Sequence, residues 1–169
     1  TYYETNEEEV SALFLARMNG TVSTEEQTNR FVSYTLKKLA GFYSERGLVM
    51  QLHIGALRNT NTAALQQLGA DTGYDIPNDL NIAASAAKLL DSMELEGNLP
   101  KTILYACNAK DNLSLSTLAL CFTQVGCAGK VQFGGAWWHD DHKEGMVEQL
   151  TAIAHSGALP YFVGMLTDS

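Results

Sequence analysis

Side chains able to do chemistry stand directly after several short apolar runs of the chain. His53 and Arg58 follow or close the run at residues 48–54, and Asp168 closes the run at residues 159–168. A neutral imidazole can ligate a metal or shuttle a proton, and a carboxylate can ligate or act as a base. His53 and Asp168 are therefore a workable pair for a mononuclear metal and proton-transfer site, although two residues do not complete one.

The apolar runs themselves are predicted to be strands buried on both faces, because they are continuous rather than alternating. They cover residues 48–54, 101–108, 130–135 and 159–168. Three segments between them carry apolar residues at helical spacing. These cover residues 79–95, 112–125 and 143–155. The alternation predicts parallel strands joined by right-handed crossovers.

Two helices are predicted ahead of these strands. The first, over residues 5–20, has three glutamates in its first turn, which suits the positive end of the helix dipole. The second, over residues 23–47, opens with a capping box of Ser23 and Glu26 and ends at Gly47. We therefore expect a purely helical segment before the alternating part of the chain.

Parallel strands of this kind belong either to a doubly wound open sheet or to a (β/α)8 barrel, and both place chemistry at the carboxyl ends of the strands. A Rossmann nucleotide site requires a glycine-rich turn leading straight from strand to helix. The one glycine pair, at residues 134–135, is followed by tryptophans and carboxylates where phosphate would approach. A barrel segment over residues 48–169, preceded by the helical segment 1–47, explains the sequence better.

Composition narrows the class of partner. The net charge is −8, with 19 acidic and 11 basic residues, and the basic residues are scattered, which disfavours nucleic acid. No apolar run approaches the ~20 residues that span a bilayer, so we expect no membrane partner. The odd number of cysteines, Cys107, Cys121 and Cys127, suits reduced thiols in a cytoplasmic protein.

Five separated blocks of the sequence resemble, in order and spacing, successive blocks of the uronate isomerase (glucuronate isomerase) family of the amidohydrolase superfamily. They are MQLHIGALRNTN, LGADTGYD, LPKTILYACNAKDN, GKVQFGGAWWHDDHKEGMVEQL and FVGMLTDS. The resemblance implies that the chain is the C-terminal part of a (β/α)8 TIM barrel, with the four strands corresponding to strands five to eight. Both ends of the chain then look internal, and strands one to four are missing.

The resemblance also implies an activity. The family interconverts glucuronate with fructuronate, and galacturonate with tagaturonate, by moving a proton from C2 to C1 through a cis-enediol. It binds one divalent metal, commonly zinc, through a His-x-His pair on strand one and an aspartate at the end of strand eight. No His-x-His occurs in this chain, so the resemblance implies an incomplete metal site and a fragment that is inactive alone.

Four residues take roles from the resemblance. Asp168 falls on the strand-eight aspartate, which would be metal ligand and base, and His53 falls on the strand-five histidine, which would assist at the metal. Trp137 lies in the double-tryptophan loop and would wall the sugar, and Arg58 would pair with the sugar carboxylate. The family arginine two residues beyond Asp168 would be position 170, past the 169 residues of the chain.

Each of these residues also has a purely structural interpretation. A lone strand-end aspartate is often a cap, a histidine beside a glycine turn is often only hydrogen-bonded, and Arg58 suits a surface salt bridge. We expect Trp138 to pack in the core and the HDDH sequence at 139–142 to be no metal cluster. Lys110 and Asp111 suit either a loop salt bridge or the site.

Two other classes of function stay open: a fragment of another metal hydrolase of the same superfamily, and a free-standing α/β binding module. For the fragment we expect self-association, because the inner face of a half barrel and its two outer strand edges would be uncovered.

Overall fold

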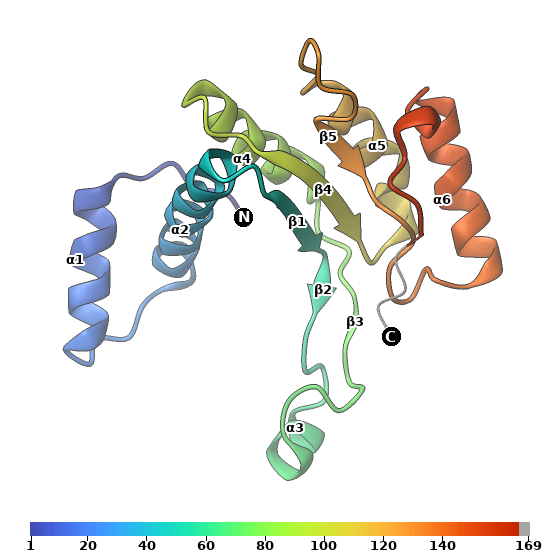
Figure 1. Ribbon diagram of the computed structural model, residues 1–169. Helices are drawn as coiled ribbons and strands as arrows, with labels where there is room; N and C mark the ends of the chain where they lie inside the picture. The colour runs from blue at the N-terminus through green and yellow to red at the C-terminus, as the bar shows by residue number, and fades with distance from the viewer. Residues whose placement is uncertain (166–169) are drawn as a thin grey trace. The chain divides into compact units, whose positions relative to one another are not determined.

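The structure is a computed structural model that describes residues 1–165 (Figure 1). The chain divides into two compact units. The first contains residues 1–50 and 84–101, and the second contains residues 51–83 and those from 102 onward. Strands and helices follow one another along the chain, so the predicted α/β class is confirmed.

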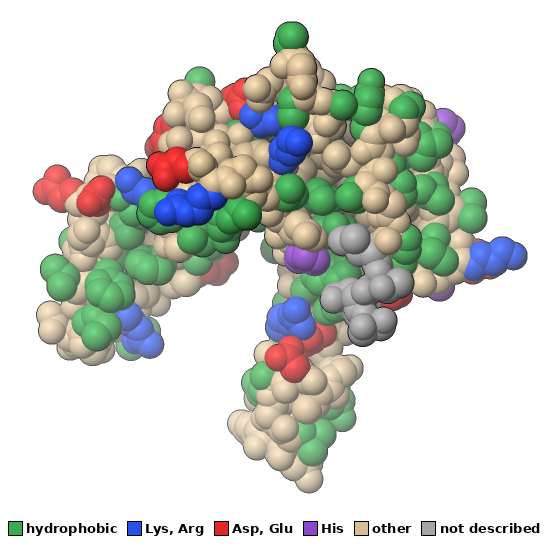
Figure 2. All heavy atoms as spheres, in the orientation of Figure 1, with side chains coloured by type: hydrophobic (Ala, Val, Ile, Leu, Met, Phe, Trp, Pro, Cys, Tyr) green, Lys and Arg blue, Asp and Glu red, His purple; other side chains and the backbone are tan. Residues whose placement is uncertain are grey.

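The first unit is built mainly from three helices, α1 (Glu7–Met18), α2 (Glu25–Glu45) and most of α4 (Ala83–Leu95). Ala40 of α2 and Leu90 and Met93 of α4 have no exposed surface, so they form the centre of this unit. Helix α1 buries Val10, whereas many of its other apolar side chains reach the surface (Figure 2).

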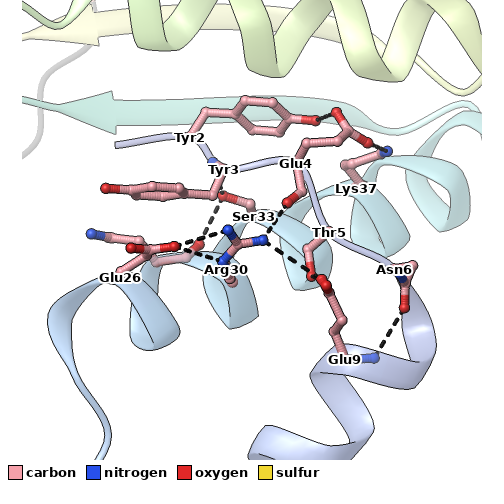
Figure 3. A network of polar contacts seen from close by, with 11 residues as sticks. Tyr2, Tyr3, Glu4, Thr5, Asn6, Glu9, Glu26, Arg30, Ser33 and Lys37 are labelled. Atoms are coloured by element: carbon pink, nitrogen blue, oxygen red, sulfur yellow. Dashed lines mark hydrogen bonds and ion pairs between the residues drawn. The ribbon is translucent and has the colours of Figure 1, made fainter.

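Arg30 on α2 ties the start of the chain to this helix (Figure 3). Its guanidinium donates to the Glu26 carboxylate and to the Glu4 carbonyl oxygen, both at 2.8 Å. Further along the same helix, the Lys37 ammonium pairs with the Glu96 carboxylate at 2.6 Å. The hydrogen bond to the Glu4 carbonyl holds the N-terminal segment on α2, whereas the Glu26 and Glu96 carboxylates are partly exposed, so their ion pairs stabilise the fold little.

The start of α2 differs by one residue from its prediction. The capping box consists of Thr24 and Gln27, in which Thr24 Oγ1 accepts from the Gln27 N–H at 3.2 Å and Gln27 Oε1 accepts from the Thr24 N–H at 2.9 Å. The prediction of Ser23 and Glu26 is wrong, because Thr24 is the last residue with extended backbone, at φ −71° and ψ 165°, before the helix begins at Glu25.

This cap gives a stability prediction. We expect Thr24→Ala to lower the free energy of unfolding by about 1 kcal/mol, since the N-cap oxygen satisfies a helix N–H that otherwise lacks a partner. Ser23→Ala is the matched control and should change the free energy of unfolding by less than about half that amount. Urea denaturation followed by circular dichroism measures both. A larger loss for Ser23→Ala would show that the cap lies at Ser23.

The main sheet has the strand order β1 (Val49–Ile54), β4 (Lys101–Ala106) and β5 (Val131–Phe133). Strands β4 and β5 are parallel, with Thr102 opposite Val131 and Leu104 opposite Phe133. Helix α5 (Asn112–Leu120) packs against β5 and against α6 (Lys143–His155). Leu104, Leu115 and Ile153, which are almost completely buried, form the core between these elements.

The fourth predicted strand is wrong over the described part of its length. Leu159–Tyr161 is a 3-10 helix, and residues 162–165 form no strand. Pro160 fixes φ in the first turn of this helix and offers no N–H to a ladder. Turn hydrogen bonds run from Tyr161 N–H to the Ala158 carbonyl and from Phe162 N–H to the Leu159 carbonyl. Two predicted helices are also shorter than expected, since α4 begins at Ala83 and α5 ends at Leu120.

A short arm follows β1. It contains β2 (Ala56–Leu57), α3 (Thr62–Leu68) and β3 (Ile76–Pro77), and β2 pairs with β3 in antiparallel fashion. The base of the arm is closed by a hydrogen bond of 2.7 Å from Asn78 N–H to the Gly55 carbonyl, and Gly55 has φ +94°, which favours glycine. Along the chain the arm connects β1 to α4.

Two further predictions from composition concern the state of the cysteines and the presence of membrane-spanning helices. Cys107, Cys121 and Cys127 are free, which confirms the prediction of unpaired thiols. Burial raises the pKa of the Cys107 thiol to about 11, so this thiol stays protonated at neutral pH. Over residues 1–165, no helix combines the length and the hydropathy that crossing a membrane requires.

Candidate active site

Three aromatic side chains meet where the strands of the main sheet end. The His53 imidazole stacks on the ring of Tyr105, with 4.6 Å between centroids and 13° between planes. The Trp137 indole meets the same imidazole edge-on, at 4.7 Å and 69°. The ends of β1 and β4 are held together by a hydrogen bond of 3.4 Å from Cys107 N–H to the Ile54 carbonyl. The structure therefore brings together two of the residues that the sequence proposes for the site, His53 and Trp137.

Tyr105 is a member of this cluster that the sequence did not reveal. It lies near the end of β4, is 2% exposed and has a hydroxyl with no hydrogen-bond partner among residues 1–165. Burial raises the pKa of this hydroxyl. The signal that identifies it is the strand order, because β4 lies next to β1 and Tyr105 is one residue from the end of β4.

The aromatic cluster continues along the loop after β5. The rings of Trp137 and Trp138 are 5.2 Å apart, and the His139 imidazole meets Trp138 edge-on at 4.3 Å. His139 has φ +72°, an uncommon conformation for a residue with a side chain. The expectation that Trp138 is core is wrong, because Trp138 is half-buried and the Arg58 guanidinium lies 5.3 Å above its ring.

Arg58 is held by acidic residues of the arm. Its Nη1 lies 2.6 Å from an Asp75 oxygen and 3.3 Å from an Asp71 oxygen. The other Asp75 oxygen accepts from the Asn59 N–H at 2.7 Å. The Asn59 N–H and the Arg58 guanidinium lower the pKa of Asp75, and the hydrogen bond to Asp75 raises the pKa of Arg58. A sugar carboxylate at Arg58 would have to compete with Asp75.

An open pocket of about 300 Å³ lies between Arg58 with its acidic partners and the ring of Trp138. Its lining consists of Arg58, Asp71, Gly73, Asp75, Trp138 and His139. The pocket combines an aromatic face, a cation and two carboxylates, which are groups that can contact hydroxyls and a charged group of a small polar ligand.

The lowered pKa of Asp75 gives a pH prediction. A carboxylate whose folded pKa is depressed contributes stability above its unfolded pKa and loses it as the pH falls through the folded value. We therefore expect the Arg58–Asp75 contact to persist below pH ~3.9, the ordinary pKa of Asp. The ¹³C shift of the Asp75 carboxyl reports the midpoint, which should rise in Arg58→Ala. An unchanged, ordinary midpoint in both proteins would contradict the assignment.

The loop after β4 forms a salt bridge, one of the two roles left open for its residues. Lys110 Nζ lies 3.1 Å from Asp111 Oδ1 and donates to the Leu80 carbonyl at 3.0 Å. Asp111 is 5% exposed, and its other oxygen has no hydrogen-bond partner among residues 1–165. The Asn108 side chain donates to the Asn78 carbonyl at 3.2 Å, so this loop is joined to the base of the arm.

The predicted pair of metal ligands, His53 and Asp168, falls only partly within the described residues. Asp168 lies outside residues 1–165, so its position is not described. Within that range, no group of three His, Cys, Asp or Glu side chains is placed to hold a metal ion. His142 instead caps α6, where its Nδ1 accepts from the Gly145 N–H at 3.2 Å.

An α/β chain with histidine and aromatic side chains gathered at its strand ends is of the class that carries an active site at that edge of the sheet. The model of the glucuronate isomerase family matches residues 1–169, and the chain belongs to this family.

Relatives of this family are similar over almost all of the chain. The chain is 44% identical over 168 residues to the uronate isomerase of Clostridium acetobutylicum and 48% identical over 169 residues to that of Bacillus pumilus. These alignments cover 99% and 100% of the chain but 36% and 35% of the relatives. The chain therefore spans about a third of the length of these relatives.

Solved structures agree with this comparison. The uronate isomerase of Thermotoga maritima superposes with a TM-score of 0.88 at 30% identity, covering 99% of this chain and 36% of that one. The glucuronate isomerase of Caulobacter crescentus superposes with a TM-score of 0.83 at 28% identity, covering 99% of this chain and 34% of that one. The arrangement of the described elements is thus similar to about a third of each structure.

Proposed function

We propose that this chain works as part of a longer uronate isomerase and contributes one side of its active site. The match of the family model to residues 1–169 carries the proposal. The cluster of His53, Tyr105 and Trp137 at the strand ends supports it, because it offers an imidazole beside aromatic surface at one edge of the sheet. In this proposal residues 48–169 supply strands five to eight of a (β/α)8 barrel and residues 1–47 form the helical segment before it.

The reaction interconverts D-glucuronate with D-fructuronate, and D-galacturonate with D-tagaturonate, in the cytoplasm. A proton leaves C2 and returns at C1 through a cis-enediol, so the site needs a base beside the substrate carbonyl and a group that stabilises the developing negative charge. Asp168 is the proposed base. His53 lies near the end of β1 and can orient or assist proton movement at the substrate oxygens.

Two side chains are proposed to bind the sugar. Trp137 presents part of its indole beside His53 and would form a wall for the apolar face of the sugar ring. Arg58 would contact the sugar carboxylate through its guanidinium fork, which requires that the Asp75 contact be shared or exchanged. Binding of the sugar carboxylate to Arg58 would therefore compete with the contact between Arg58 and Asp75.

The family resemblance implies a divalent metal, which we propose to be zinc in the longer protein. A catalytic zinc site ordinarily has three protein ligands. The cluster in residues 1–165 supplies one candidate ligand, His53, and no group of three within that range. The described residues alone do not fit the metal, and the rest of the longer protein would have to supply the missing ligands.

The function is tested with the full-length protein and a panel of sugars, followed by NMR of the reaction mixture. We expect conversion of D-glucuronate or D-galacturonate to the corresponding ketouronate and much slower conversion of D-glucose, which lacks the carboxylate. Hydrolysis of amide or ester substrates without uronate turnover would favour the superfamily hydrolase instead. Ligand binding with neither reaction would favour the binding module.

His53 is tested against the other histidines of the chain. In the full-length protein, His53→Ala should lower kcat for D-glucuronate by about 100-fold or more, because a group that assists proton transfer at the reacting centre is lost. His155→Ala, at an exposed histidine of α6, is the control and should stay within about threefold of the parent kcat. In the double variant His139→Ala/His142→Ala, metal content measured by atomic emission should stay unchanged. A fall would show that His139 and His142 bind the metal, contrary to the prediction.

A further inference from the structure

Gly134, the first residue after β5, lies against the ring of Tyr105. A Cβ built at this position would lie 2.7 Å from Tyr105 Cζ and closer still to Tyr105 Cε1, which is nearer than side chains approach one another. Gly134 is not among the residues with positive φ, so its backbone would accept other residue types. The absence of a side chain at Gly134 is therefore explained by the space that Tyr105 fills.

The backbone of Gly134 is held from two sides. Its N–H donates to the Leu104 carbonyl on β4 at 2.8 Å, and its carbonyl accepts from Nε2 of Gln149 on α6. Gln149 is 2% exposed, so this amide contact is sheltered from water. Because these bonds fix the Gly134 backbone, a side chain there would move Tyr105 rather than the strand.

Tyr105 in turn supports His53. The imidazole lies nearly parallel to the phenol ring, at 13° and 4.6 Å, while His53 itself is exposed. The terminal torsion of a histidine has broad minima, so an exposed imidazole on a strand turns easily unless a flat surface holds it. The Tyr105 ring provides that surface, and its buried hydroxyl has no partner among residues 1–165 to give it a separate polar role.

We propose that Tyr105 is a positioning residue: its ring, admitted by the glycine at position 134, holds the plane of the His53 imidazole for the isomerisation. The proposal rests on the proposed function for its effect on turnover, but the orientation of the ring can be measured without turnover. The phenol ring carries the role and the hydroxyl does not.

The test uses full-length protein with ¹³C-labelled histidine and the variants Tyr105→Phe, Tyr105→Leu and Gly134→Ala. We expect Tyr105→Phe to keep kcat within about threefold, whereas Tyr105→Leu and Gly134→Ala should lower kcat about 10- to 100-fold with a smaller change in KM, since small misplacements of a reacting group are costly. Tyr161→Leu, at an exposed tyrosine, is the matched control and should leave kcat unchanged.

Relaxation of the His53 ring carbons gives the second readout. The ring should be as rigid as the backbone in the parent and in Tyr105→Phe, and mobile in Tyr105→Leu. An equal loss of kcat in Tyr105→Phe and Tyr105→Leu, or a folded Tyr105→Leu with parent kcat and a rigid ring, would overturn the proposal. If Tyr105→Leu does not fold, the parent decides, because a freely turning His53 ring there overturns it. A parent with a rigid ring and no uronate turnover would refute the proposed function and leave the positioning role standing.

Discussion

Asp168→Asn in the full-length protein should lower kcat for D-glucuronate isomerisation by ~100- to 10,000-fold, the usual contribution of a general acid or base. Asparagine keeps the size of the side chain but can neither accept the C2 proton nor carry the negative charge. The assignment depends on the resemblance of the closing block FVGMLTDS, because Asp168 lies outside the described residues.

Asp141→Asn is the matched control for this variant. Asp141 is an exposed aspartate in the loop before α6, and its neutralisation should leave kcat within about twofold of the parent. Initial rates at saturating substrate measure both variants. Near-normal turnover by Asp168→Asn, with metal content and melting temperature unchanged, would remove Asp168 from the reaction.

The 169-residue chain on its own should self-associate. Many large apolar side chains of both units are exposed, among them Leu15 (61%), Met18 (70%), Val22 (82%), Val125 (102%) and Val147 (58%). Burying such surface is worth about 25 cal/mol per Å², and the outer strands of the described sheet, β1 and β5, present edges that can pair with another copy.

Sedimentation velocity over a wide concentration range and binding of a hydrophobic dye measure this association. We expect mass to increase with concentration and the dye to bind. Replacing Met18 and Val22 together by lysine should reduce dye binding without unfolding, because both side chains are exposed. A monodisperse monomer that binds no dye would contradict the prediction.

Sequence patterns predicted most of the fold because a strand that is buried on both faces appears in the sequence as a continuous apolar run, and an amphipathic helix as apolar residues at helical spacing. The continuous apolar runs at β4 and β5 and the helical spacing of α6 are such patterns. The prediction that the run at β1 is buried on both faces is wrong, because Val49, Gln51 and His53 on one face of this strand are exposed. The run from residue 159 has the same apolar composition, yet Pro160 turns its start into a 3-10 helix. Hydropathy records that a segment is apolar, whereas the loss of a backbone donor decides whether it joins a ladder.

The candidate site was predicted in part for a similar reason. His53 and Trp137 are polar or bulky groups at strand ends, where an unusual residue type is visible in the sequence. Tyr105 looks like core in the sequence, and its role follows from the close approach of Gly134. The acidic partners of Arg58 arrive from the arm, whose tertiary path no local pattern specifies.

The proposal that this chain is one part of a longer uronate isomerase is tested most directly by comparing uronate turnover by the full-length protein and by the 169-residue chain at equal molar concentration, with zinc or manganese supplied to both. NMR of D-glucuronate over time gives the rate in each case. We expect D-fructuronate from the full-length protein and none from the 169-residue chain alone, because the chain is proposed to supply only one side of the site. Turnover by the chain alone at a rate comparable to the full-length protein, or no turnover of any uronate by the full-length protein, would contradict the proposal.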